Sequence, residues 1–267
     1  MIGGKTRVLA ILGDPVSHSL SPAMHNAAFR ALGLDAVYVA LRAQANDVPT
    51  LMRALASAGG GGNVTVPHKE TAARAVSRPS ERAAALGACN TFWGGDGELH
   101  GDNTDVEGIL AALDRLEAPA TAWLIAGTGG GGRSAVAAAL DRGARVSIRS
   151  RETGRRQEFE RWAVGKGATL VAAAECEVLI NATPLGLNPG DHLPLAIDVA
   201  PHAQVAFDMV YGRGETPWVR LMRNEGLRAS DGRAMLISQG VAAFRRWFPE
   251  EDPPTEVMRA AVNEGLR

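Results

Sequence analysis

The sequence predicts an α/β protein made of two units with mostly parallel sheets, of which the second has the pattern of a Rossmann-type dinucleotide-binding domain. Strand-like and helix-like patterns alternate along the whole chain, which favours parallel strands connected by helices. A glycine-rich turn, GTGGGG at residues 127–132, lies directly between an apolar strand and an Ala-rich helix. The 267 residues are enough for one large domain or two modest ones.

In the first unit, short apolar runs alternate with segments of helical pattern. The first helix begins with Ser-Pro, and proline is favoured in the first turn of a helix. The pattern is a βαβαβ unit, which favours a mostly parallel sheet with helices on both faces. The expected elements are a strand over 7–12, a helix over 21–32, a strand over 36–41, a helix over 47–57, a strand over 62–66 and a bridging helix over 104–116.

The second unit has the same alternation, and the chain ends in two helical patterns. These last two patterns lie within 235–267 and are separated by the proline-containing segment 249–254. The expected elements of the second unit are a strand over 121–126, a helix over 133–141, a strand over 145–150 and further buried strands over 177–181 and 205–208.

The composition excludes several classes of protein. Hydrophobic residues make up 46% and charged residues 21%, as in ordinary globular proteins. A net charge of −1 argues against a nucleic-acid partner. No apolar run approaches the roughly twenty residues of a membrane helix, and the N-terminal run over 8–12 is too short for a signal peptide, so we expect a cytoplasmic protein. The two cysteines, Cys89 and Cys176, have no disulfide or metal-site spacing, and we expect no metal.

The glycine-rich turn predicts a dinucleotide site. Glycines permit a tight turn and let the backbone approach a pyrophosphate, while the following helix offers unpaired N–H groups and the positive end of its dipole. The spacing departs from strict GxGxxG, so a flexible loop is the alternative.

The end of the next strand indicates which dinucleotide is bound. Sites for NAD usually carry an acidic residue there, whereas this chain has Ser150 and Arg151, with Arg155 and Arg156 close behind. Clustered guanidinium groups suit a 2′-phosphate. We therefore expect NADP, with NAD less favoured. A solvated basic turn that includes Glu152 is the alternative.

Two polar segments follow predicted strands, where functional residues concentrate. In HSLSP, the hydroxyls of Ser19 and Ser21 near a helix start are suited to a carboxylate, although Ser21 alone also fits an ordinary helix N-cap. In NVTVPHK, strand alternation places Asn63 and Thr65 on one face, and Lys69 follows the proline. A lone exposed lysine is the common alternative. Two further segments, GACNT and GDNTD, taken singly, are equally typical of turns.

Taken together, these segments resemble the shikimate dehydrogenase family, which includes shikimate- and quinate-dehydrogenase-like proteins. The resemblance covers nearly the whole chain, in the family's order and spacing. It implies a substrate-binding and catalytic domain formed by 1–104 and 235–267, and an NADP-binding Rossmann domain formed by 105–234. The matching motifs are HSLSP, NVTVPHK, GACNT, GDNTD, AGTGGGG, NATPLG, DMVYGRGETP and DGRAMLISQGVAAF.

The resemblance implies NADP-dependent, reversible reduction of 3-dehydroshikimate to shikimate, a step of aromatic amino acid biosynthesis. Lys69 and Asp105 match the family's catalytic pair, and Ser19 and Ser21 match the residues that hold the substrate carboxylate. A lysine ammonium would stabilise the negative charge that develops on the ketone oxygen and donate the proton, while the aspartate positions it.

The resemblance also assigns the remaining site residues. We expect a shikimate-like hydroxy acid as the partner and a monomer or homodimer. Residues that match positions lining the substrate ring are Asn63, Thr65, Asn90, Tyr211 and Gln239. Residues that match cofactor-contacting positions are Gly127, Thr128, Gly129, Gly130, Gly131, Ser150, Arg151, Arg155, Met209 and Gly232.

The chain departs from the family pattern at three places. His68 stands where the best-known members have an apolar aromatic residue, and we expect its ring to face solvent. Ser-Arg-Glu at 150–152 replaces the Asn-Arg-Thr of many NADP-specific members, which weakens the expectation of strict NADP preference. Ala234 replaces a glycine, a minor packing change.

Other functions remain open at this point. A paralogue acting on quinate or aminoshikimate is one alternative, and a non-catalytic NADP-binding sensor on the same fold is another. The intact Lys69 and Asp105 argue against the sensor. A methylenetetrahydrofolate dehydrogenase would not need the paired serines of HSLSP or the polar GDNTD loop. A protein-interaction module has little support, because aromatic residues make up only 5% of the chain.

Overall fold

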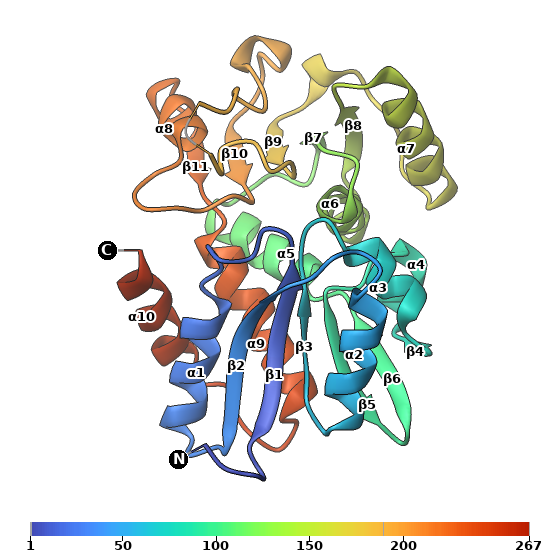
Figure 1. The fold of residues 1–267 in the computed structure, drawn as a ribbon. Helices are drawn as coiled ribbons and strands as arrows, with labels where there is room; N and C mark the ends of the chain where they lie inside the picture. Colours follow the sequence, from blue (N-terminus) through green and yellow to red (C-terminus); the bar gives the residue numbers. More distant parts are fainter. Residues whose placement is uncertain (1, 189, 267) are drawn as a thin grey trace. The chain divides into compact units, whose positions relative to one another are not determined.

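Figure 1 shows a computed structural model of the protein, which describes residues 2–188 and 190–266. The chain divides into two compact units, Met1–Asp105 with Leu236–Arg267, and Val106–Met235. The sequence predicted domain boundaries directly after residues 104 and 234. Residues 1 and 267 of the expected first domain lie outside the part of the chain that the structure describes. The functional roles assigned to the two domains remain predictions.

The first unit contains a six-stranded sheet in the order β2-β1-β3-β5-β6-β4. Strand β1 pairs in parallel with β2 and β3, and β4 pairs in parallel with β6, whereas β5 is antiparallel to both β3 and β6. The three predicted strands are present. The strands are β1 (Arg7–Gly13), β2 (Ala36–Arg42), β3 (Gly61–Val64), β4 (Arg78–Pro79), β5 (Thr91–Gly95) and β6 (Glu98–Asp102).

Helices lie on both faces of this sheet. Helix α2 packs against β1, β3 and β5, and its Val48 and Met52 form a core with Ala10 and Leu12 of β1. Helix α1 packs against β2 and against α10, beside which it lies in Figure 1. The helices are α1 (Ser21–Ala31), α2 (Val48–Ser57), α3 (Lys69–Ala75), α4 (Glu81–Leu86), α9 (Arg233–Trp247), whose first residues belong to the second unit, and α10 (Thr255–Gly265).

The second unit contains a five-stranded sheet in the order β11-β10-β9-β7-β8, with every neighbouring pair parallel. The chain runs from β7 to β8 and then returns to β9 on the other side of β7. This reversal of strand order is the switch point at which open α/β sheets bind ligands. The strands are β7 (Ala122–Ala126), β8 (Arg145–Arg149), β9 (Val178–Asn181), β10 (Val205–Asp208) and β11 (Arg228–Ser230).

The α-helices α6, α7 and α8 lie between these strands in sequence, and α5 precedes the first of the strands. Helix α6 packs against β7 and β8, α7 against β8, and α8 against β10 and β11. The α/β class, with mostly parallel sheets and a Rossmann-type unit, is therefore confirmed. The helices are α5 (Asp105–Arg115), α6 (Gly130–Asp141), α7 (Thr153–Gly165) and α8 (Pro217–Asn224), and short 3-10 helices span Ala173–Glu175 and Ile197–Val199.

Several elements were not predicted from the sequence. In the first unit these are α3, α4, β4 and the β5–β6 hairpin, and in the second unit they are α7, α8 and β11. Within residues 2–188 and 190–266, the helices are all too short or too polar to cross a membrane.

Candidate active site

One edge of the first sheet gathers the polar motifs. Strands β1 and β3 are parallel, and β6 has the same direction as β3 because both are antiparallel to β5. The carboxyl ends of these three strands, and the start of β5, therefore lie at the same edge. HSLSP follows β1, NVTVPHK includes the end of β3, GACNT leads into β5, and GDNTD includes the end of β6. Four segments that are separate in sequence thus meet in one place.

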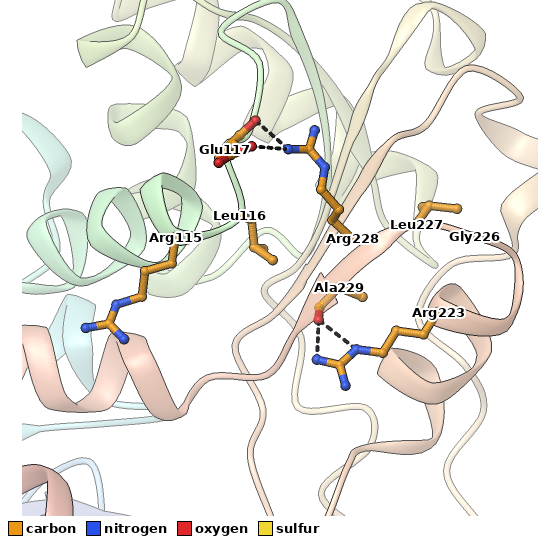
Figure 2. Close-up of a pocket in the computed structure, with 8 residues that line it drawn as sticks. All are labelled: Arg115, Leu116, Glu117, Arg223, Gly226, Leu227, Arg228 and Ala229. Carbon is orange, nitrogen blue, oxygen red and sulfur yellow. Dashed lines mark hydrogen bonds and ion pairs between the residues drawn. The ribbon is translucent and has the colours of Figure 1, made fainter.

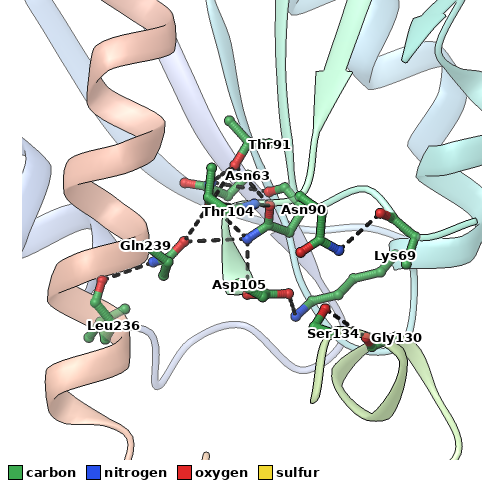
Figure 3. Close-up of polar contacts among 12 residues, drawn as sticks. Asn63, Lys69, Asn90, Thr91, Thr104, Asp105, Gly130, Ser134, Leu236 and Gln239 are labelled. Atoms are coloured by element: carbon green, nitrogen blue, oxygen red, sulfur yellow. Dashed lines mark hydrogen bonds and ion pairs between the residues drawn. The ribbon is translucent and has the colours of Figure 1, made fainter. Parts of the chain in front are cut away.

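Lys69 and Asp105 form an ion pair at this edge (Figure 3). The Nζ atom of Lys69 donates to Oδ2 of Asp105 at 2.5 Å, and their side chains are 13% and 6% exposed. Lys69 is the first residue of α3 and Asp105 the first of α5, so rigid elements hold both groups. A charge-assisted hydrogen bond with little access to water is stronger than a surface pair. The structure brings together the two residues that the sequence analysis proposed as a catalytic pair.

Asn90 holds the other oxygen of the Asp105 carboxylate. Its Nδ2 donates to Oδ1 of Asp105 at 2.9 Å, and its Oδ1 accepts the backbone N–H of Thr104 at 2.8 Å. The Oε1 atom of Gln239 lies 3.4 Å from Oγ1 of Thr104, while its Nε2 donates to the carbonyl of Leu236 at 3.0 Å. Asn90 and Gln239, both predicted site residues, are thus part of the same network as the ion pair.

Asn63 lies deeper in this network. Its Nδ2 donates to the carbonyl of Asn90 at 3.1 Å and to Oγ1 of Thr91 at 3.0 Å, and its Oδ1 accepts the hydroxyl of Tyr38 at 2.6 Å. Both ends of the amide are therefore engaged by protein groups.

Three members of the network were missed by the sequence analysis. Thr91 and Thr104 are completely buried and end the strings GACNT and GDNT, so the motifs themselves carried the signal. Tyr38 lies on β2, outside every motif, and the local sequence carried no signal for it.

The paired serines and Thr65 lie at the same edge of the sheet. Ser21 is buried and is the first residue of α1, and its backbone N–H donates to Oγ of Ser19 at 3.3 Å. The N-cap of this helix is Leu20, so the alternative that Ser21 serves only as N-cap is wrong. Thr65 directly follows β3, and its backbone N–H donates to the carbonyl of Leu12 at 2.8 Å.

His68 does not face solvent, which corrects the expectation from the sequence. The residue is 4% exposed, and its Nε2 lies 2.8 Å from the carbonyl oxygen of Ala43. Because a carbonyl oxygen can only accept, Nε2 must carry the proton. The ring is buried because it satisfies a carbonyl just beyond the end of β2, a contact that the sequence alone did not reveal.

The glycine-rich turn occupies the switch point of the second sheet, directly after β7. Gly127 has a φ of +115°, and a Cβ there would lie 2.7 Å from the carbonyl oxygen of Ala182. A Cβ at Gly132 would lie 2.3 Å from the carbonyl oxygen of Gly127. Helix α6 begins at Gly130, with Gly129 as an extended N-cap, three residues before the predicted start. The turn therefore exposes a helix N-terminus suited to a phosphate.

Met209 and Gly232 lie beside this turn. A Cβ at Gly131 would lie 3.5 Å from Sδ of Met209, and a Cβ at Gly232 would lie 2.2 Å from the carbonyl oxygen of Met209. These three predicted cofactor residues therefore pack together within the second unit. Tyr211 follows two residues after Met209 and is partly exposed.

Asp208 anchors the segment that carries Met209 and Tyr211. Its carboxylate accepts hydrogen bonds from Nδ2 of Asn181 at 2.8 Å, from the backbone N–H of Val210 at 3.0 Å and from the hydroxyl of Thr216 at 2.7 Å. Burial nevertheless raises the pKa of Asp208 to about 6.

The basic segment starts next to the glycine-rich turn, because the backbone N–H of Gly127 donates to the carbonyl of Arg149 at 3.0 Å. Ser150 follows β8 directly, and Arg155 lies in the first turn of α7. Nε of Arg155 is 4.0 Å from Oε2 of Glu152, with both side chains 70% exposed. Such an exposed pair is weak, so the guanidinium group remains available to an incoming phosphate.

A separate pocket lies elsewhere in the second unit (Figure 2). Arg223 donates to the carbonyl of Ala229 from Nε at 3.0 Å and Nη2 at 2.7 Å, and Arg228 donates to the carbonyl of Glu117 at 3.1 Å. None of the predicted site residues lines it. The lining residues are Arg115, Leu116, Glu117, Arg223, Gly226, Leu227, Arg228 and Ala229.

Comparison with known proteins finds similarity along the whole chain. Residues 11–92 match the family model of the shikimate dehydrogenase substrate binding domain, and residues 232–262 match that of the shikimate 5'-dehydrogenase C-terminal domain. A shikimate dehydrogenase (NADP(+)) of Microcystis aeruginosa is 35% identical, covering 98% of both chains. One of Synechococcus sp. is 37% identical, covering 99% of this chain and 96% of its own.

Solved structures show the same similarity. The shikimate 5-dehydrogenase of Thermus thermophilus, solved with NADP(H) and shikimate, has a TM-score of 0.86 and 34% identity, and the match covers 100% of both chains. A shikimate dehydrogenase solved with NADP+ has a TM-score of 0.89 and 28% identity, covering 100% of this chain and 98% of its own. The enzyme of Listeria monocytogenes, solved with shikimate and NAD, has a TM-score of 0.82 and 27% identity, covering 97% of each chain.

Proposed function

The chain belongs to the shikimate dehydrogenase family, and on this premise we propose that it catalyses the NADP-dependent, reversible reduction of 3-dehydroshikimate to shikimate in aromatic amino acid biosynthesis. It is an oxidoreductase acting on a CH–OH group. The names of full-length relatives and the shikimate and NADP(H) in the Thermus thermophilus structure support this reaction and cofactor.

The observation that carries the proposal is the Lys69–Asp105 pair, 2.5 Å apart and almost closed to water. NADPH, when bound, supplies the hydride that attacks the ketone carbon. Lys69 stabilises the negative charge that develops on the ketone oxygen and donates a proton from Nζ to it. Asp105 keeps the ammonium in place, and Asn90 holds the carboxylate by its second oxygen. In the reverse direction, Lys69 accepts the hydroxyl proton.

We assign the substrate contacts to the residues that match the family motifs. Ser19 and Ser21 would hold the carboxylate, because two hydroxyl groups near the start of α1 can both donate to it. The lysine can donate a proton to a ketone, and the uncharged serine hydroxyl groups can bind a carboxylate. Together they suit a substrate that is a small anionic ketone. The residues proposed to line the ring are Asn63, Thr65, Asn90, Tyr211 and Gln239.

The second unit would hold NADP. The turn at Gly127 and Gly132 has no room for side chains, which fits a close approach of the backbone to a pyrophosphate. Arg151 and Arg155 would pair with the 2′-phosphate. The full proposed set is Gly127, Thr128, Gly129, Gly130, Gly131, Ser150, Arg151, Arg155, Met209 and Gly232.

Location and assembly complete the proposal. We place the protein in the cytoplasm, as a monomer or homodimer. Both cysteines are free and buried, which fits a reducing compartment. Light scattering after size-exclusion chromatography would determine the assembly.

A substrate panel tests the proposed function. Oxidation of shikimate, quinate and aminoshikimate with NADP and with NAD is followed by the absorbance of the reduced cofactor. We expect the highest kcat/KM for shikimate with NADP. A higher value for quinate or aminoshikimate would identify a paralogue, and NADP binding without turnover of any substrate would indicate a sensor.

A further inference from the structure

Tyr38 begins a continuous chain of hydrogen bonds that ends at the ion pair. Its hydroxyl donates to Asn63 at 2.6 Å, and Asn63 donates to Thr91 at 3.0 Å. Thr91 donates to Oδ1 of Asn90 at 3.0 Å, and Asn90 donates to Asp105 at 2.9 Å. All of these residues are buried and belong to the first unit.

Backbone groups fix the direction of this chain. The carbonyl of Asn90 can only accept, so the end of the Asn63 side chain that faces it at 3.1 Å must be the NH2 group. Oδ1 of Asn63 therefore faces Tyr38, which must donate. The backbone N–H of Thr104 can only donate, so Oδ1 of Asn90 faces it and the NH2 group faces Asp105. Oδ1 of Asn90 can only accept, so Thr91 is the donor in their hydrogen bond, although Oγ1 of Thr91 also lies 3.1 Å from Oγ1 of Thr104. Along the path through Asn90, each donor points toward the Asp105 carboxylate.

The ring of Tyr38 is held rigidly. It is 1% exposed and lies with its centroid 4.7 Å from that of His25 and 5.8 Å from that of Trp247. Burial lowers the pKa of His25 to about 3, so this imidazole is neutral at physiological pH and places no charge beside the phenol. The hydroxyl therefore has a fixed position from which to orient Asn63.

We propose that Tyr38 is a positioning residue, whose hydroxyl fixes the amide of Asn63 and, through Thr91 and Asn90, holds Asp105 in the orientation that binds Lys69. The inference rests on the proposed function of the Lys69–Asp105 pair. Hydrogen bonds aligned head to tail polarise one another, so losing the first donor weakens the last bond as well as the first. Tyr38 itself touches neither of the reacting groups.

Tyr38→Phe removes the hydroxyl and keeps the ring. We expect kcat to fall about 3- to 10-fold, the equivalent of one buried hydrogen bond, with KM for shikimate changed by less than about twofold. Trp123→Phe is the matched control, because it removes a hydrogen bond from Nε1 of the buried Trp123 to the carbonyl of Pro119 in the second unit, outside the aromatic layer that holds Tyr38. We expect its kcat to stay within about twofold of the wild type.

Lysine labelling gives a second readout that does not depend on turnover. The chain has lysine only at positions 5, 69 and 166, and Lys5 and Lys166 are exposed and serve as internal references. Trace acetylation with acetic anhydride, quantified by mass spectrometry of peptides, measures how firmly Asp105 holds the ammonium of Lys69. We expect the labelling of Lys69 relative to Lys166 to rise about 3- to 10-fold in Tyr38→Phe and to stay unchanged in Trp123→Phe.

Thr91→Val and Thr91→Ser test the middle of the chain independently. The valine variant breaks the chain and should reproduce both effects, whereas the serine variant keeps the hydroxyl and should resemble the wild type. If Tyr38→Phe and Thr91→Val are folded and keep the kcat and the Lys69 labelling of the wild type, the positioning role is wrong. If Tyr38→Phe and Trp123→Phe lose kcat equally and the labelling of Lys69 is unchanged, the positioning role is also wrong. A wild-type protein without turnover would contradict the proposed function instead, while the labelling result would still decide the role of Tyr38.

Discussion

Lys69 and Asp105 are separated by 36 residues in sequence, yet their charged groups are 2.5 Å apart. Removing one partner of a buried pair leaves the other charge without compensation, so the pair is sensitive to truncation. Because Lys69 is assigned the proton transfer, its loss should affect turnover far more than binding of the cofactor by the second unit.

Lys69→Ala should therefore lower kcat by at least about 100-fold, the lower end of what a positioned acid–base group contributes. Turnover measured at saturating shikimate and NADP checks this, and circular dichroism checks that the variant is folded. Lys166→Ala, at an exposed position, is the control. Near-normal turnover of Lys69→Ala would remove this residue from the mechanism.

Asp208 should make stability depend on pH. Its pKa rises from 3.8 to about 6 on folding, so the folded state binds this proton more tightly than the unfolded state. The resulting stabilisation is complete below the unfolded pKa and is lost as pH rises through about 6. The shift corresponds to roughly 3 kcal/mol.

The Asp208→Asn variant has no titratable group at position 208. Urea unfolding of the variant and the wild type at about pH 4 and about pH 7 should show the variant gaining stability relative to the wild type at the higher pH. Asp252→Asn, which replaces an exposed carboxylate, is the control. Its stability relative to the wild type should be the same at both pH values. The same pH dependence in both proteins would show that Asp208 titrates normally.

At the scale of elements, segments with a clear apolar or periodic pattern were predictable, and those without one were not. Strands β7, β9 and β10 of the second unit were found because strands buried on both faces are continuous apolar runs, whereas the three-residue strand β11 was missed. Helix α3 has seven residues, too few for a helical period to be recognised. The hairpin β5–β6 was missed although Asp96 and Gly97 both have positive φ, the conformation for which Asp-Gly is the usual signal in two-residue turns.

The same contrast applies to the candidate site. The sequence analysis found Lys69, Asp105 and Asn90 because they lie in motifs that resemble those of the shikimate dehydrogenase family. Tyr38 could not be found, because its role depends on the pairing of β2 with β1 and of β1 with β3, which brings it near Asn63. His68 was misjudged for the same reason, since its partner Ala43 lies 25 residues away in sequence.

The glycine-rich turn should tolerate no side chain at Gly127. Gly127→Ala adds a methyl group 2.7 Å from the carbonyl oxygen of Ala182, at a φ of +115°. We expect the Kd for NADP, measured by fluorescence titration, to rise at least about tenfold, because a shift of the turn moves the N–H groups at the start of α6. Gly165→Ala, whose methyl group would meet no atom within 4 Å, is the control. An unchanged Kd for Gly127→Ala would contradict the assignment of this turn to the pyrophosphate.

For the whole molecule, bound cofactor should raise the unfolding temperature, because a ligand that binds only the folded state stabilises it. At about 100 times its Kd, NADP should contribute about 2.7 kcal/mol and raise Tm by roughly 5–10 °C. NAD at the same concentration should have a smaller effect. The double variant Arg151→Ala with Arg155→Ala should remove the difference between the cofactors in differential scanning calorimetry. Equal shifts for NADP and NAD in the wild type would show that these arginines do not select the 2′-phosphate.

The first unit is built from two segments, one before and one after the second unit in sequence, with α10 packed on α1 and with Gln239 of α9 in the Asn90 network. A ribosome releases residues 106–235 between these two parts, so the nascent sheet over 7–102 must wait for α9 and α10 until the second unit has emerged. Translation therefore imposes an order of maturation. The glycine-rich turn can form on the growing chain, but the hydrogen-bond network around Asp105 can be completed only after Gln239 has been synthesised.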